Sequence, residues 1–215
     1  MNEYLIKIVI IGDKNTGKSS LLKNYKDNHN NQTLPTIGVD FITSSINNIK
    51  LHIWDTSGSK SFFNLIRLYF KTCCGFIITF RLDDITSFLS IENWINHILT
   101  ESQSYKHFVF IATHTDNERN VPKELILQIC NKYNTICFEI NAKLCTGINE
   151  VFNELTNRIL SDYAKNPNWF NNLEGFKDCK PKKTIQTNDY ILFDDDIQDN
   201  KSICEKISHN LCAIS

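Results

Sequence analysis

The chain has 215 residues, of which 41% are hydrophobic and 11% aromatic, and its formal net charge is −1. This apolar content excludes a wholly disordered chain, and the near-neutral charge lacks the basic footprint of nucleic-acid-binding proteins. The 8 cysteines include no CxxC pair, and the sequence shows neither a signal-peptide pattern nor an apolar run long enough to span a membrane. We therefore expect a cytoplasmic protein with reduced thiols and no nucleic-acid partner.

The order of the predicted elements is that of an α/β domain. Apolar runs bounded by turn residues predict strands over residues 1–11, 39–46, 50–54, 75–80, 108–113 and 136–140. Apolar residues at helical spacing predict helices over residues 19–26, 64–71, 85–99, 121–133 and 147–163. Asn47 and Asn48 tolerate positive φ, so they predict a tight hairpin between the second and third strands. Alternating strands and helices predict a six-stranded, mostly parallel sheet with helices on both faces.

The segment Gly12–Ser19, GDKNTGKS, lies between the first predicted strand and the first predicted helix. Its terminal glycines let backbone N–H groups and the helix N-terminus point at a polyphosphate. In this P-loop pattern Lys18 reaches the β- and γ-phosphates, and Ser19 offers its hydroxyl to Mg²⁺. The alternative is a turn that only caps the helix. Ligands of parallel sheets bind at the carboxyl ends of the strands. Four residues that could contact a ligand lie at or just after the carboxyl ends of predicted strands: Gly12, Asp55, Thr113 and Asn141.

The chain changes character near residue 166. Residues 166–215 combine prolines, many polar residues and the acidic cluster Asp194–Asp196, with no sustained periodicity. We expect a folded domain over residues 1–165 followed by a flexible tail over residues 166–215.

Taken together, the motifs resemble those of the Ras superfamily of small GTPases, and within it the Rab branch. They are GDKNTGKS at residues 12–19, TIGVDF at 36–41, WDTSG at 54–58, THTD at 113–116 and NAK at 141–143. They follow the family's order and spacing and cover residues 3–164. The resemblance implies the small-GTPase form of the P-loop NTPase fold and a GTP/GDP switch in vesicle traffic.

The resemblance also implies guanine nucleotide as ligand and Mg²⁺ as cofactor, held by Ser19, Thr36 and Asp55. Asp116 would accept hydrogen bonds from guanine N1–H and the 2-amino group, and the Ala142 N–H would bind O6. These contacts argue against the reading as a P-loop ATPase. The implied nucleotide-binding set is Gly12, Lys14, Asn15, Thr16, Gly17, Lys18, Ser19, Ser20, Thr36, Gly58, Thr113, His114, Asp116, Asn141, Ala142 and Lys143.

Two segments are implied to change conformation with the nucleotide, a first switch segment over residues 29–40 and a second over residues 57–70. Thr36 and Gly58 would respond to the γ-phosphate. Effectors, exchange factors and GTPase-activating proteins would bind Thr36–Phe41 and Ser57–Phe70. The implied catalytic residues are Lys18, Thr36 and Ser59.

Departures from the family pattern predict altered kinetics. Ser59 stands where the family has the Gln that orients the attacking water, so we expect slow intrinsic hydrolysis. Lys14 either assists the γ-phosphate, obstructs an arginine finger, or is simply solvated, whereas Asn15 tolerates a left-handed backbone. His114 replaces the Lys that packs on the base and Thr113 replaces Asn, so we expect faster nucleotide release.

The last four residues, CAIS, match a C-a-a-X box with Cys212 as the prenylation site. One lipid binds a membrane only marginally, so a second signal is expected, either acylated Cys204 or a protein partner. The expected location is the cytosolic face of an internal or plasma membrane. Two functions remain open: a cycling Rab-like GTPase, or a GTP-bound, membrane-tethered scaffold with little hydrolysis.

Overall fold

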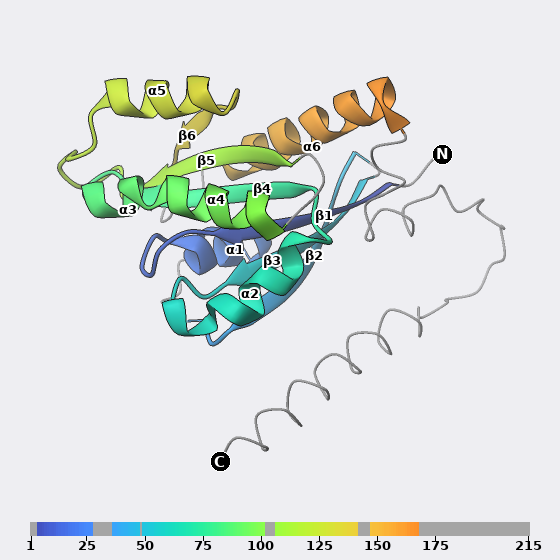
Figure 1. Cartoon of the computed structure of the whole chain (residues 1–215), viewed down its shortest axis with the longest axis horizontal. Coiled ribbons are helices and arrows are strands. Elements are labelled where there is room, and N and C mark those ends of the chain that lie inside the picture. Colours follow the sequence, from blue (N-terminus) through green and yellow to red (C-terminus); the bar gives the residue numbers. More distant parts are fainter. Residues whose placement is uncertain (1–3, 28–35, 48, 102–105, 142–146, 168–215) are drawn as a thin grey trace, which may run out of the picture. The chain divides into compact units, whose positions relative to one another are not determined.

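The computed structural model describes residues 4–27, 36–47, 49–101, 106–141 and 147–167 (Figure 1). In chain order the elements are β1 (Tyr4–Ile11), α1 (Lys18–Asp27), β2 (Val39–Ile46), β3 (Ile49–Thr56), a 3₁₀ turn (Lys60–Phe62), α2 (Phe63–Phe70), β4 (Gly75–Arg81), α3 (Ile85–Leu89), α4 (Ile91–Glu101), β5 (His107–Thr113), α5 (Lys123–Lys132), β6 (Cys137–Glu139) and α6 (Ile148–Lys165). The predicted tail with Cys204 and Cys212, like Asn48, Ala142 and Lys143, lies outside the described residues.

The strands form a six-stranded sheet in the order β2-β3-β1-β4-β5-β6. The β2–β3 pair is antiparallel, and β1–β3, β1–β4, β4–β5 and β5–β6 are parallel. Asn47 adopts a φ of 48° at the turn between β2 and β3, as its tolerance of positive φ predicts. The prediction of a mostly parallel six-stranded sheet is confirmed.

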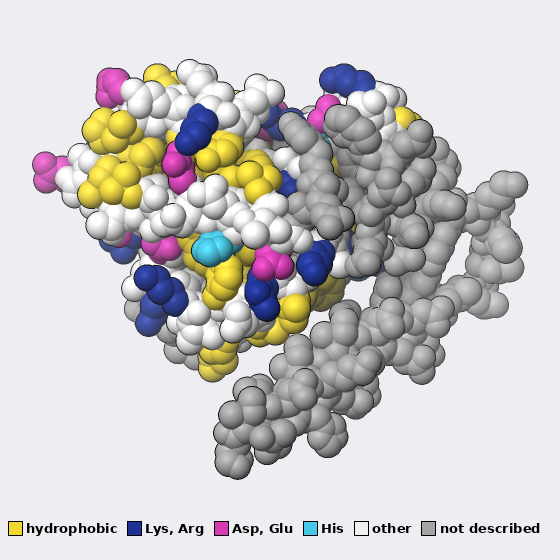
Figure 2. All heavy atoms as spheres, in the orientation of Figure 1, with side chains coloured by type: hydrophobic (Ala, Val, Ile, Leu, Met, Phe, Trp, Pro, Cys, Tyr) yellow, Lys and Arg dark blue, Asp and Glu magenta, His cyan; other side chains and the backbone are white. Residues whose placement is uncertain are grey.

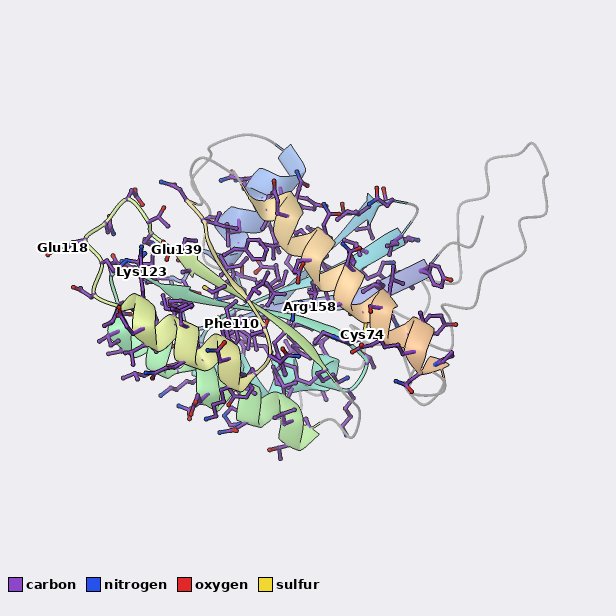
Figure 3. The ribbon with its side chains drawn as sticks, turned by 90° about the horizontal axis from the view of Figure 1, so that it is seen from above. Cys74, Phe110, Glu118, Lys123, Glu139 and Arg158 are labelled. Carbon is purple, nitrogen blue, oxygen red and sulfur yellow. The ribbon has the colours of Figure 1, made fainter. Side chains whose placement is uncertain are left out.

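Helices cover both faces of the sheet, as predicted (Figures 1 and 3). Successive residues of β1 serve opposite faces: Ile8 and Ile10 pack in one buried cluster with α1 and α6, whereas Val9 and Ile11 pack in the other with α2, α4 and α5. A strand buried on both sides needs this continuous apolar run, because successive side chains point to opposite faces. The two clusters fix the sheet, and the sheet fixes the loops at its carboxyl edge.

One predicted helix is wrong in its continuity. The apolar spacing over residues 85–99 predicts a single helix, but the structure divides it into α3 and α4 at Ser90. The Ser90 hydroxyl donates to the Thr86 carbonyl oxygen at 3.0 Å, a local bond that competes with regular helix geometry. At its start, α3 is capped by Asp84, whose carboxylate accepts from the Thr86 N–H.

Other boundaries moved by a few residues. Pro122 is the N-cap of α5 rather than a residue of its first turn, because its ψ of 143° is extended and helical geometry begins only at Lys123. The strand expected over residues 136–140 is shorter, Cys137–Glu139, and pairs only with β5. Because β6 is an edge strand, it can form backbone hydrogen bonds with β5 on one side only, and this limits its length.

Candidate nucleotide site

The loop between β1 and α1 wraps into a tight cradle. Gly12, Asn15 and Gly17 have φ values of 143°, 65° and 83°, a region that glycine enters freely and Asn tolerates better than most residues. A Cβ on Gly12 would lie 2.2 Å from the Thr79 carbonyl oxygen, so β4 leaves room only for glycine there. Asn15 is accommodated as the sequence predicted, and Lys14 beside it is exposed.

Lys18 lies inside this loop. Its Nζ donates to the carbonyl oxygens of Gly12 at 3.0 Å and Asp13 at 2.7 Å, and the residue is 5% exposed. Burial lowers the Lys18 pKa to about 8, against the opposing charges of Asp55 and Asp13. A desolvated ammonium favours an added negative charge nearby, because an anion restores the charged form. The loop therefore presents the cation that a phosphate requires.

Ser19, Thr36 and Asp55 meet next to the loop. The Ser19 Oγ and Thr36 Oγ1 are 2.6 Å apart, and the Thr36 hydroxyl donates to Asp55 Oδ2 at 3.1 Å. Asp55 is 5% exposed; burial raises its pKa, and hydrogen bonds from Ser19 and Thr36 oppose the rise. Its Oδ1 is buried with no hydrogen-bond partner among the described residues. Two hydroxyls and an orphaned carboxylate oxygen form a donor set that fits Mg²⁺.

The second switch segment packs directly on the phosphate loop. A Cβ on Gly58 would lie 2.3 Å from the Lys14 nitrogen and 2.3 Å from the Asp13 carbonyl carbon, so no larger residue fits. The Ser57 N–H donates to the Gly38 carbonyl oxygen at 2.8 Å, which joins the two switch segments. The Ser59 hydroxyl pairs with that of Ser61 at 2.8 Å.

Threonine hydroxyls link the phosphate loop to the sheet beneath it. The Thr16 and Thr79 hydroxyls are 2.6 Å apart, and the Thr113 hydroxyl donates to the Thr16 carbonyl oxygen at 3.1 Å. All three residues are buried. Thr113, which stands where the family has Asn, therefore fixes the end of β5 to the phosphate loop through its shorter side chain.

On the base side of the site, His114 follows β5 with a φ of 57°, and its Nδ1 lies 2.9 Å from the Thr113 hydroxyl. Asp116 is exposed in the turn that follows His114, and Asn141 lies shortly after β6. The sheet order places both loops at the same carboxyl edge as Gly12 and Asp55. The described members of the predicted set thus share one edge of the sheet.

Sequence reasoning missed one contact of the phosphate loop. The indole Nε1 of Trp94, in α4, donates to Asp13 Oδ1 at 2.9 Å across 81 positions of sequence. Trp94 also lies against Phe63, the first residue of α2, with ring centroids 6.2 Å apart. In the sequence Trp94 is one of several apolar residues at helical spacing, so no local signal distinguishes it.

Comparisons with known proteins agree with this geometry. A family model described as the Ras family matches residues 7–161. The chain belongs to the Ras family. It is 30% identical over 165 residues to the Ras-related protein Rab-13 of Canis lupus familiaris, covering 74% of this chain and 81% of the relative. It is 32% identical over 158 residues to the Ras-related protein RAB1BV of Beta vulgaris, covering 70% and 74%.

The Ras-related protein SEC4 of Candida albicans is 29% identical over 170 residues, covering 76% of this chain and 81% of the relative. These relatives identify the chain as a divergent, Rab-like member of the Ras superfamily of small GTPases. The sheet order and phosphate loop described above are those expected for this family. The resemblance carried by the five sequence motifs is confirmed.

Proposed function

We propose that this Rab-like chain is a GTP/GDP switch that acts in vesicle traffic with Mg²⁺ as its cofactor. The observation that carries the proposal is the buried, unpartnered Oδ1 of Asp55 beside the Ser19 and Thr36 hydroxyls. A buried carboxylate oxygen without a hydrogen-bond partner is costly, and a divalent cation would remove that cost. Its place next to Lys18 indicates a metal that accompanies phosphate.

Each group of predicted site residues has its own role in this proposal. Lys18 and the loop N–H groups from residue 14 to 19 would bind the β- and γ-phosphates. Ser19, Thr36 and Asp55 would hold Mg²⁺, which when bound neutralises phosphate charge. Asp116, with Ala142 outside the described residues, would select guanine. The proposed nucleotide-contacting set is the one given from the family motifs: Gly12, Lys14 to Ser20, Thr36, Gly58, Thr113, His114, Asp116 and Asn141 to Lys143.

Thr36 connects nucleotide state to partner binding. Thr36 precedes β2, and its hydroxyl contacts both the Ser19 hydroxyl and the Asp55 carboxylate. Residues 29–35 of the first switch segment lie outside the described residues. In the second switch segment, Gly58 lies directly against the backbone of the phosphate loop at Asp13 and Lys14. Loss of the γ-phosphate and the metal contact would release both segments, as in other order–disorder switches.

Ser59 favours slow hydrolysis. The Ser59 hydroxyl is hydrogen-bonded to that of Ser61, and the Ser59 side chain is two atoms shorter in reach than the Gln of the family pattern. Lys14 is exposed at the rim of the loop and is free to approach a phosphate or to remain solvated. The second candidate function, a GTP-bound scaffold with little hydrolysis, follows from the same Ser59 observation.

The partner surface of the proposal consists of Thr36–Phe41 and Ser57–Phe70. Aromatic rings join the two segments: Phe41 and Trp54 have centroids 5.1 Å apart, and Trp54 and Tyr69 5.5 Å apart. Ile37 is 85% exposed and Leu68 57% exposed. Figure 2 shows hydrophobic side chains at the surface over the helices α2 to α5. Exposed apolar side chains beside segments that move with the nucleotide suit state-dependent protein partners.

Membrane association in this proposal depends on prenylation of Cys212. Among the described residues no helix is both long and apolar enough to span a bilayer. A single lipid gives marginal binding, so Cys204 or a protein partner would supply the second signal on the cytosolic face of an internal or plasma membrane.

The test is the nucleotide that copurifies with the full chain. We expect guanine nucleotide, released by EDTA, and a predominance of GTP would favour the scaffold over the cycling enzyme. Asp55→Asn removes the orphaned carboxylate at constant shape, and we expect it to abolish the effect of Mg²⁺ on nucleotide release. Asp40→Asn, an exposed carboxylate on β2, is the control. Copurified adenine nucleotide, or a purified chain that binds no added guanine nucleotide, would overturn the proposal.

A further inference from the structure

Residues at the end of β4 hold the loop that follows β5. Leu82 N donates to the Thr113 carbonyl oxygen at 3.0 Å, and the Leu82 carbonyl oxygen accepts from Asn120 N at 2.8 Å and Val121 N at 3.0 Å. Leu82 therefore fixes both ends of the loop over residues 114–120, which carries Asp116. Figure 3 places Glu118 at the outer edge of this loop.

Asp83 fixes the middle of the same loop. Its carboxylate accepts two hydrogen bonds from Arg81, from Nε at 2.8 Å and Nη2 at 2.7 Å, and one from Asn117 Nδ2 at 2.5 Å. Its carbonyl oxygen accepts from Asn120 Nδ2 at 2.7 Å. The Arg81 guanidinium, with Asn117, holds the pKa of Asp83 well below its usual range. Charge-assisted, bidentate pairs of this kind are among the strongest side-chain contacts.

The loop needs such an anchor. Residues 114–117 form a turn closed by Asn117 N, which donates to the His114 carbonyl oxygen at 3.1 Å. His114 has a φ of 57°, a conformation that an L-residue keeps only when its surroundings hold it. Asp116 is inside this turn, directly before Asn117, and Asn117 is the side chain that reaches Asp83.

We propose that Asp83 is a specificity-determining positioning residue, which holds the turn over residues 114–117 so that the Asp116 carboxylate meets the 2-amino group of guanine. The inference rests on the proposed function. Asp83 touches no base itself; it acts through Asn117. Nothing in the family motifs marks it, because it lies outside all of them.

Loss of the Asp83 contact should affect the binding of GDP and of IDP to different extents. The 2-amino group distinguishes guanine from hypoxanthine and is recognised by a carboxylate, whereas both bases share the ring and both nucleotides share the phosphates. A turn that loses its anchor should weaken GDP binding more than IDP binding, because hypoxanthine keeps the N1–H contact with Asp116 and lacks only the 2-amino group. General loss of structure would instead weaken both nucleotides by the same factor.

The experiment measures dissociation constants for GDP and IDP on the full chain with Mg²⁺. For Asp83→Asn we expect the IDP-to-GDP ratio of dissociation constants to fall about tenfold. Asn117→Ala removes the loop side of the contact and leaves the Arg81–Asp83 pair intact, so it should lower the ratio to a similar extent. The double variant should lower it no further than either single variant.

The control is Asp84→Asn. Asp84 is the neighbouring carboxylate and caps α3 through Thr86, where Asn serves equally well. It should leave the ratio unchanged. A wild-type ratio that persists in both Asp83→Asn and Asn117→Ala would overturn the role of Asp83 and leave the proposed function standing. A wild-type chain that binds GDP and IDP equally would overturn the guanine assignment, and the role of Asp83 with it.

Discussion

The hydrogen bond between Trp94 and Asp13 gives the sharpest stability prediction. Trp94 Nε1 lies 2.9 Å from Asp13 Oδ1, and Trp94→Phe removes the donor while it keeps an aromatic ring against Phe63. Asp13→Ala removes the acceptor, and leaves the Asp13 carbonyl oxygen, which accepts from Lys18, in the main chain. The two changes together form a double-mutant cycle.

A hydrogen bond to a charged acceptor contributes about 1.5–3 kcal/mol. Asp13 is half-buried, and water screens its charge, so we expect a coupling energy near the lower end, about 1.5 kcal/mol. For a domain of this size that corresponds to about 3–6 °C in Tm. The smaller Phe ring also costs stability, but that cost appears on both sides of the cycle and cancels.

The assay is urea unfolding of the wild type, the two single variants and the double variant, with the same saturating nucleotide throughout. Far-UV circular dichroism follows unfolding, because the fluorescence changes with Trp94 itself. A parallel cycle of Trp94→Phe with Glu92→Ala, a partly exposed residue of α4 whose carboxylate pairs with Lys132 and not with Asp13, should be additive within about 0.5 kcal/mol. A Trp94–Asp13 coupling no larger than this control would refute the reasoning.

Further predictions concern hydrolysis, pH and the core. Ser59→Gln should speed single-turnover GTP hydrolysis about tenfold or more by restoring a side chain that orients water, whereas Ser61→Gln should not; equal rates would contradict the role assigned to position 59. Burial lowers the His107 pKa to about 4, with Asp162 opposing and Arg158 and Lys106 adding to the shift. The neutral imidazole therefore contributes stability that is complete above pH 6.5 and lost as pH falls toward 4, about 3 kcal/mol in all. His107→Gln should flatten this acid decline in urea midpoints, and an unchanged decline would disprove the assignment. Phe152→Ala should cost about 3–5 kcal/mol by leaving a cavity in the α1–α6 core, and Phe152→Leu clearly less; similar losses for both would argue against a packed core there.

Much of the site could be predicted from the sequence because its rules are local. The phosphate loop needs Gly12 and Gly17 at positive φ and tolerates Asn15 there, and these are properties of single residues. The strands follow from continuous apolar runs, and parallel strands bring their carboxyl ends to one edge. The sequence therefore predicted which loops would meet before any contact was known.

The tertiary structure decided which side chains touch. The Ser19–Thr36–Asp55 cluster, the Trp94–Asp13 bond and the Asp83–Asn117 bond join residues on different elements. Such contacts depend on strand order, register and the turn of each helix, and a change of one residue in any of these would separate them. No short stretch of sequence contains that information, because side-chain geometry between distant segments exists only once both hydrophobic clusters have packed.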